Sequence, residues 1–97
     1  MKFEMSLREY LAIIDETEKQ IIASDELKSR LRKANVDQDP MSLLEVVQDA
    51  QLLALKALCW AKGSAALLQM VGRMYMAEPE VISALDRLHR TTQAFLV

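Results

Sequence analysis

Glycine and proline are scarce in this chain, whose 97 residues include two of each. Folds built from many short strands need these residues at their turns, so their scarcity argues against a turn-rich β architecture. Residues that favour helices dominate instead: alanine, leucine, methionine, glutamate, lysine, arginine and glutamine. We therefore predict an all-α protein that forms a single domain over residues 1–97.

Cysteine and histidine occur once each, as Cys59 and His89. A single cysteine cannot form an internal disulfide, which is typical of a reducing compartment. A nucleophilic cysteine would need a base within hydrogen-bond distance, and the single histidine belongs to a different predicted helix. Asp86 and His89 have the spacing of metal ligands in helical bundles, but such sites need carboxylates from facing helices and usually a second histidine. We predict no enzyme activity, no metal and no cofactor, and we infer no small-molecule substrate.

No sign of charge prevails, because the formal net charge is −2 and both signs are mixed along the chain. The field is therefore too weak to attract nucleic acid or anionic lipid by itself. Long apolar runs are also missing. Lys56, Lys62 and Arg73 interrupt the most apolar segment, whose longest uncharged run, 63–72, is about half of the roughly 20 residues that a bilayer requires. The N-terminus carries no signal or transit peptide pattern, so we expect a cytoplasmic protein without a membrane span.

The first half of the chain carries clear helix start signals. Ser6 and Glu9 have the spacing of a capping box. The apolar positions change helix face after residue 23, and Ser24 followed by two acidic residues predicts a kink or break with a second helix start. Asn35 is a candidate left-handed cap at the end of that helix.

The second half begins with Asp39 and Pro40, an N-cap followed by proline at the first helical position. One uncharged arc then continues in phase to residue 75, which predicts a long central helix over about 40–77. Gly63 leaves open a tight turn there instead. Pro79 starts a last helix whose predicted buried stripe is Val81, Leu85, Leu88 and Phe95. Together these elements predict a three- or four-helix antiparallel bundle or hairpin.

Small residues recur along the arc of the central helix, where they allow another helix to approach closely. An ordinary intramolecular core is one interpretation. The other is a contact with a partner chain, because a long helix that is apolar on two sides needs more cover than the two flanking helices provide. The predicted partner interface consists of Ala50, Ala54, Ala57, Ala61, Leu68, Met70, Met74 and Tyr75.

A basic cluster lies near the end of the second helix, and it consists of Lys28, Arg30, Arg32 and Lys33. These side chains are candidates for contacts with phosphates or an acidic partner, although no aromatic residue lies among them to stack on bases. The sequence therefore favours a non-enzymatic module for protein interaction, such as an adaptor, a small chaperone or an assembly subunit. It would associate with itself or bind a partner helix through the central helix. The alternative is a small regulator that contacts nucleic acid through the basic cluster.

Overall fold

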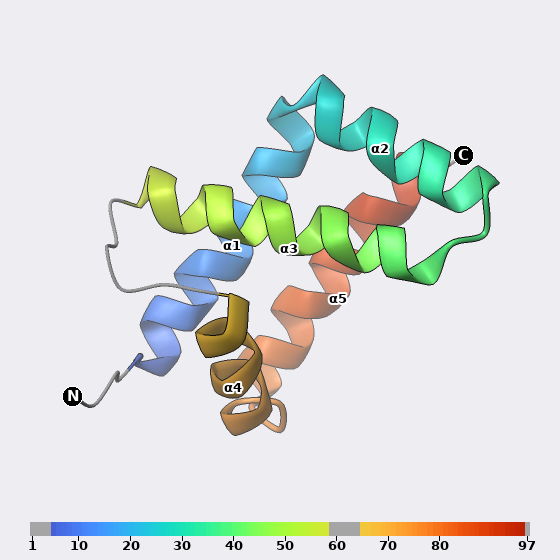
Figure 1. Ribbon diagram of the computed structural model, residues 1–97. Coiled ribbons are helices and arrows are strands. Elements are labelled where there is room, and N and C mark those ends of the chain that lie inside the picture. The colour runs from blue at the N-terminus through green and yellow to red at the C-terminus, as the bar shows by residue number, and fades with distance from the viewer. Residues whose placement is uncertain (1–4, 59–64, 97) are drawn as a thin grey trace.

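The computed structural model describes residues 5–58 and 65–96, and the described part of the chain forms five helices (Figure 1). This confirms the predicted all-α class and the helical bundle. The helices are α1 (Leu7–Ala23), α2 (Asp25–Val36), α3 (Pro40–Ala57), α4 (Ala65–Met74) and α5 (Pro79–Ala94). The radius of gyration is 13.2 Å, close to the value of about 13 Å expected for a folded domain of 100 residues.

The predicted helix starts of α1, α2 and α3 are confirmed, because each has a side-chain cap. The Glu9 amide donates to Ser6 Oγ at 3.1 Å, and the Glu9 carboxylate accepts from the Ser6 amide at 3.1 Å. Ser24 ends α1 and caps α2, with its Oγ accepting from the Leu27 amide at 3.1 Å. Asp39 Oδ1 accepts from the first amides of α3, which starts at Pro40 as expected.

The end of α2 differs from the prediction. The helix includes Asn35 and continues to Val36, and the residue with positive φ is Gln38, at 53°. The side-chain amide of Asn35 instead donates to the Leu96 carbonyl at 3.3 Å. A contact with the C-terminal end of the chain therefore replaces the local cap at Asn35. The backbone adopts the left-handed conformation three residues later, at Gln38.

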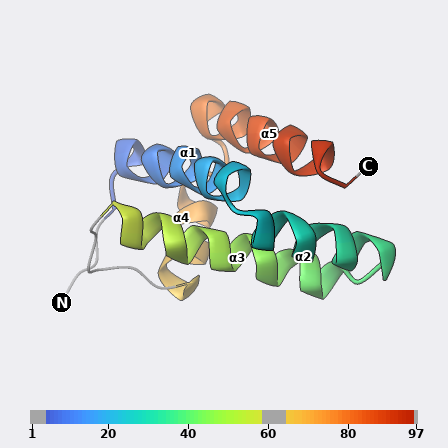
Figure 2. The same ribbon diagram turned by 90° about the horizontal axis from the view of Figure 1, so that it is seen from above.

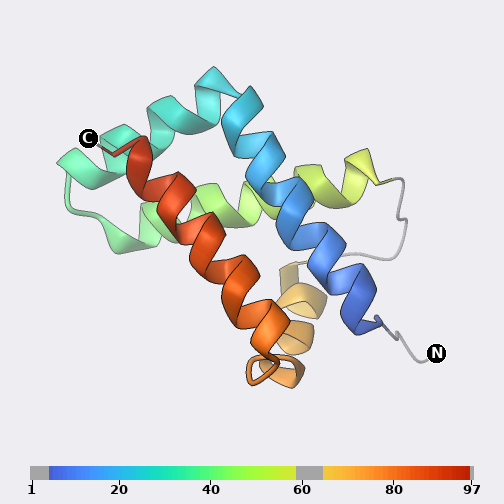
Figure 3. The same ribbon diagram turned by 180° about the vertical axis from the view of Figure 1, so that it is seen from behind.

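The helices form two crossed layers. Figure 2 shows α1 and α5 in one layer and α2 and α3 in the other, and Figure 3 shows α3 crossing behind α1 and α5. Arg87 contacts Asp15 at 2.6 Å, and one turn further along both helices Thr91 contacts Glu18 at 3.1 Å. This register shows that α1 and α5 run in the same direction.

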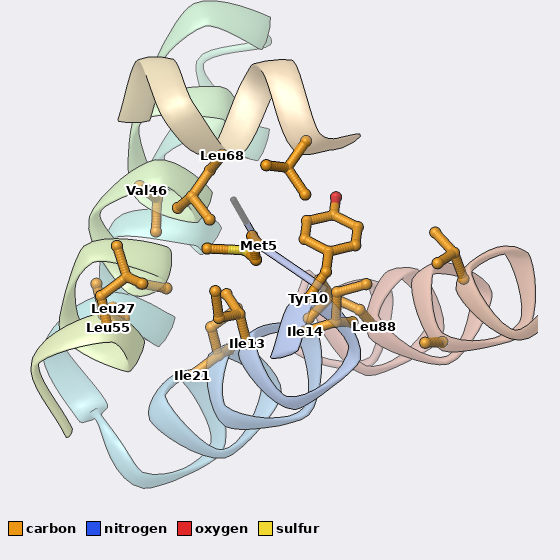
Figure 4. Close-up of a cluster of buried hydrophobic side chains, with 14 of the residues drawn as sticks. Met5, Tyr10, Ile13, Ile14, Ile21, Leu27, Val46, Leu55, Leu68 and Leu88 are labelled. Carbon is orange, nitrogen blue, oxygen red and sulfur yellow. The ribbon is translucent and has the colours of Figure 1, made fainter. Parts of the chain in front are cut away.

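The core lies between these layers and receives apolar side chains from all five helices (Figure 4). Its largest fully buried apolar side chains come from α1, α2, α4 and α5: Ile13, Ile21, Leu31, Val71 and Val81. Thr17 is also fully buried, and its hydroxyl donates to the Ile13 carbonyl at 2.7 Å. Each helix thus buries one face against the same cluster, as in a single bundle.

The predicted continuous central helix over 40–77 is wrong, because α3 ends at Ala57 and α4 begins at Ala65. A straight helix of that length would extend about 57 Å, whereas the longest dimension of the molecule is 41 Å. The separate α4 instead buries Leu68 and Val71 in the common core. Gly63, which we considered as the point of interruption, lies outside the described residues.

Candidate partner-binding surfaces

The predicted partner interface divides into a buried and an exposed part. Ala50 and Ala54 are fully buried on α3, and Leu68 is almost completely buried on α4. Because α1 crosses α3 (Figure 1), the two alanines allow a close approach between these helices. The intramolecular interpretation therefore holds for these three residues, and the folded chain leaves them no surface for a partner.

Tyr75 also makes contacts within the chain. Its hydroxyl donates to the Met5 carbonyl at 2.7 Å, and its ring centroid lies 6.1 Å from that of Tyr10. On the same face of α4, a Cβ atom added to Gly72 would lie 2.9 Å from the Tyr10 hydroxyl oxygen. These contacts fasten α4 to the start of α1.

The exposed part of the predicted interface consists of Ala57, Met70 and Met74. Met74 is 66% exposed, and Met76, just after α4, is exposed to the same extent, at 67%. Ala61 lies outside the described residues. The predicted residues therefore form no single continuous surface.

An apolar groove of about 390 Å³ runs between α3 and α5, and we call it the α3–α5 groove. Its floor is the buried Leu31 of α2, and Leu44 at its edge is 48% exposed. None of the described residues that line it is Asp, Glu, Lys or Arg. They are Leu31, Leu43, Leu44, Val47, Leu88, His89, Thr92 and Gln93.

Two further exposed apolar side chains follow the helices that form this groove. Met41 lies one turn before Leu44 on α3, and Leu85 lies one turn before His89 on α5. We predicted Leu85 as part of the buried stripe of the last helix, but it is 40% exposed and Ala84 is buried in its place. Ala84 lies one turn before Arg87, whose side chain contacts Asp15 of α1, so this smaller residue lies on the side of α5 that is turned toward α1. Sequence reasoning missed the exposed apolar surface beside the α3–α5 groove, because the apolar stripe of the last helix does not show which of its two edges meets another helix.

A second groove, of about 420 Å³, lies between the start of α2 and the second half of α3. We call this surface the α2–α3 face. Leu52 and Leu53 are each 41% exposed there, above the buried Leu27. Charged and polar side chains surround these leucines: Ser24, Glu26, Arg30, Asp49 and Lys56. The surface therefore combines an apolar centre with charges of both signs.

The basic cluster is largely used within the molecule. Arg30 forms an ion pair with Asp49 at 2.7 Å, which joins α2 to α3. Arg32 Nε donates to the Phe95 carbonyl at 3.1 Å, which joins α2 to the end of α5. Both arginines thus stabilise contacts between helices.

The two lysines of the cluster differ from each other. Lys28 Nζ lies 3.2 Å from Asp25 and 5.2 Å from the centroid of the Phe95 ring. Lys33 is exposed and lines a smaller groove with Asp37 and Glu45. The four predicted phosphate contacts therefore form no patch of uniform positive charge, since acidic side chains lie beside them.

Within residues 5–58 and 65–96, the titratable groups with shifted pKa values are outside both grooves. Hydrogen bonds from the side chain and the amide of Ser42 lower the pKa of Asp39, and burial raises the pKa of Tyr10. Among the described residues, no group of three or more histidine, cysteine, aspartate or glutamate side chains could hold a metal ion. No helix in that part of the chain is long and apolar enough to cross a membrane.

Comparison with known proteins finds no family model, no curated protein and no solved structure that matches this chain. A functional proposal therefore depends on the chemistry of the two surfaces. The α3–α5 groove is apolar and free of charge along its lining, whereas the α2–α3 face carries both signs. These two surfaces suit different kinds of contact.

Proposed function

We propose that this protein is a non-enzymatic interaction module that binds an amphipathic helix of a partner protein in the α3–α5 groove. The observation that carries the proposal is the groove itself, whose leucine and valine walls lie between two helices. Adaptor, small chaperone and assembly subunit are all roles that such a module could perform.

The chemistry of the groove indicates the kind of ligand that it favours. Apolar surface left in water costs about 25 cal/mol per Å², so a ligand that covers Leu44 and Val47 recovers that free energy. A partner helix can place apolar residues at positions i, i+3 or i+4, and i+7 along one side. His89, Thr92 and Gln93 add polar groups along the α5 wall, which could fix the orientation of a bound helix.

The alternative function, contact with nucleic acid through the basic cluster, has less support. Arg30 and Arg32 are both engaged by groups of the same chain. A phosphate would have to compete with a carboxylate for Arg30. If the alternative holds, DNA or RNA is retained at low salt and is released when both arginines are neutralised, with a steep dependence on salt.

The experiment that tests the proposal compares two single substitutions at exposed apolar positions. Leu44→Glu places a carboxylate at the edge of the groove, and Val36→Glu places the same group at the exposed end of α2. Phage-displayed helical peptides would be selected against the wild-type protein and their affinities measured by fluorescence anisotropy. We expect Leu44→Glu to weaken binding by about tenfold or more, because a buried carboxylate would remain unpaired, and Val36→Glu to bind as the wild type does.

Two measurements complete this test. Circular dichroism melting of both variants establishes that each remains folded, and chemical shift changes in the wild type locate the bound peptide. Proteins captured from the native host would then be compared between the same two variants. Equal binding by Leu44→Glu and wild type, or shift changes that avoid α3 and α5, would refute the groove as the binding site.

A further inference from the structure

The solvent side of the second half of α3 carries two leucines between two opposite charges. Leu52 and Leu53 are exposed side chains on the α2–α3 face. Asp49 lies one turn before them and Lys56 one turn after them. At 100° per residue, these four positions fall within an arc of about 100°. They therefore form one continuous strip along the helix.

This strip is complementary to itself. If two copies of α3 pack antiparallel about a two-fold axis between residues 52 and 53, Leu52 of each copy lies at the level of Leu53 of the other, and the four leucines pack together around the axis. The same axis places Lys56 of each copy opposite Asp49 of the other, so the contact contains two pairs of opposite charge. Self-complementarity of this kind is the requirement for an isologous dimer, and opposite charges placed in this way set its register.

The charges around the strip are compatible with this arrangement. Asp49 is already paired with Arg30 through one oxygen, at 2.7 Å, but a carboxylate can accept several hydrogen bonds and can hold Lys56 as well. Glu26 is exposed on the opposite side of the groove, so a second acid lines the same surface as that lysine.

We propose that the α2–α3 face is the contact surface of a homodimer, in which the α3 helices of two copies pack antiparallel. The 18 residues of α3 extend about 27 Å, so this face is smaller than the roughly 800 Å² per partner of a standard stable interface. The dimer is accordingly weak and depends on concentration. It goes beyond the partner helix proposed above, because the residues of α3 that line the α3–α5 groove are centred about half a turn away.

The decisive experiment exchanges the two charges between copies. Lys56→Asp alone places two acids opposite each other, and Asp49→Lys alone places two lysines opposite each other. Sedimentation equilibrium over concentrations from about 10 µM to about 1 mM would measure association. We expect each variant to raise the dissociation constant by about tenfold or more. An equimolar mixture of the two variants restores both opposite-charge pairs, and we expect it to form heterodimers as tightly as the wild type dimerises.

Other variants separate dimer formation from folding and from partner binding. Asp49→Lys removes the pair with Arg30, so its melting temperature is measured, whereas Lys56→Asp leaves that pair in place. Leu44→Glu should leave dimerisation unchanged, and Lys56→Asp should leave peptide binding unchanged. Intermolecular NOEs between the methyl groups of Leu52 and Leu53, in a mixture of labelled and unlabelled wild type, test the contact directly.

The proposal is overturned by any of three results. A wild type that remains monomeric over the whole concentration range excludes the dimer. A Lys56→Asp variant that dimerises as the wild type does excludes the charge pairing. A mixture that associates no better than its separate folded components excludes the antiparallel register.

Discussion

Replacing Gly72 by alanine tests the placement of α4 against α1. The added Cβ atom would lie 2.9 Å from the hydroxyl oxygen of Tyr10, which is closer than real Cβ contacts, and 3.7 Å from the ring carbon Cζ. Tyr10 is 5% exposed, so its ring has little room to move away. The substitution therefore introduces a steric conflict between two helices that are distant in the sequence.

Two opposing effects set the expected magnitude. Alanine in place of glycine inside a helix contributes about 1 kcal/mol of stability, whereas an additional methyl group in a packed contact costs about 1 to 3 kcal/mol. The net change for Gly72→Ala is a loss of about 0 to 2 kcal/mol. Tyr10→Phe removes the oxygen and leaves Cζ as the nearest atom, at an ordinary contact distance. In that background the same substitution should stabilise the protein by about 1 kcal/mol.

The measurement is a double-mutant cycle of urea unfolding followed by circular dichroism. We expect a coupling free energy of about 1 to 3 kcal/mol between the two positions. The double variant should be more stable, by this amount, than the sum of the two single changes predicts. The cycle cancels any other effect of losing the tyrosine hydroxyl. If Gly72→Ala stabilises the wild type as much as it stabilises Tyr10→Phe, α4 does not lie against α1 as described, and the account of the divided central segment fails.

Two further predictions concern the helix starts. The hydrogen bonds from Ser42 hold the pKa of Asp39 below its usual value of 3.8, so this carboxylate stabilises the fold above that pH, and its contribution is lost as the pH falls through the lower folded value. Acid unfolding of Asp39→Asn should lack this component, and a variant with the same acid dependence as the wild type would contradict the cap. Ser24→Ala leaves the Leu27 amide of α2 without its acceptor and should cost about 1 kcal/mol, a decrease of about 4 to 8 °C in melting temperature. Ser29→Ala, at an exposed position inside α2, is the matched control and should not lower the melting temperature, so an equal decrease in both variants would argue against the cap.

The candidate surfaces were only partly predictable. The pattern placed Ala50 and Ala54 on the correct face of their helix, but it could not tell whether that face meets α1 or a partner. Ala84 and Leu85 lie at opposite edges of one apolar stripe, and the edge that is turned toward α1 is the one that is buried. The acid that engages Arg30 was also not predictable, because Asp49 lies 19 residues from this arginine along the chain.

The sequence by itself determined the helical class, the break at Ser24 and the starts of the helices at Leu7, Asp25, Pro40 and Pro79. These features depend on hydrogen bonds and backbone preferences that act within one helical turn, so neighbouring residues are enough to specify them. The end of α3, the position of α4 and the parallel arrangement of α1 and α5 were decided by the tertiary structure. A continuous helix and two separate helices satisfy the same apolar pattern equally well. They differ in how much of that pattern the rest of the chain can bury, which is a property of the whole folded molecule.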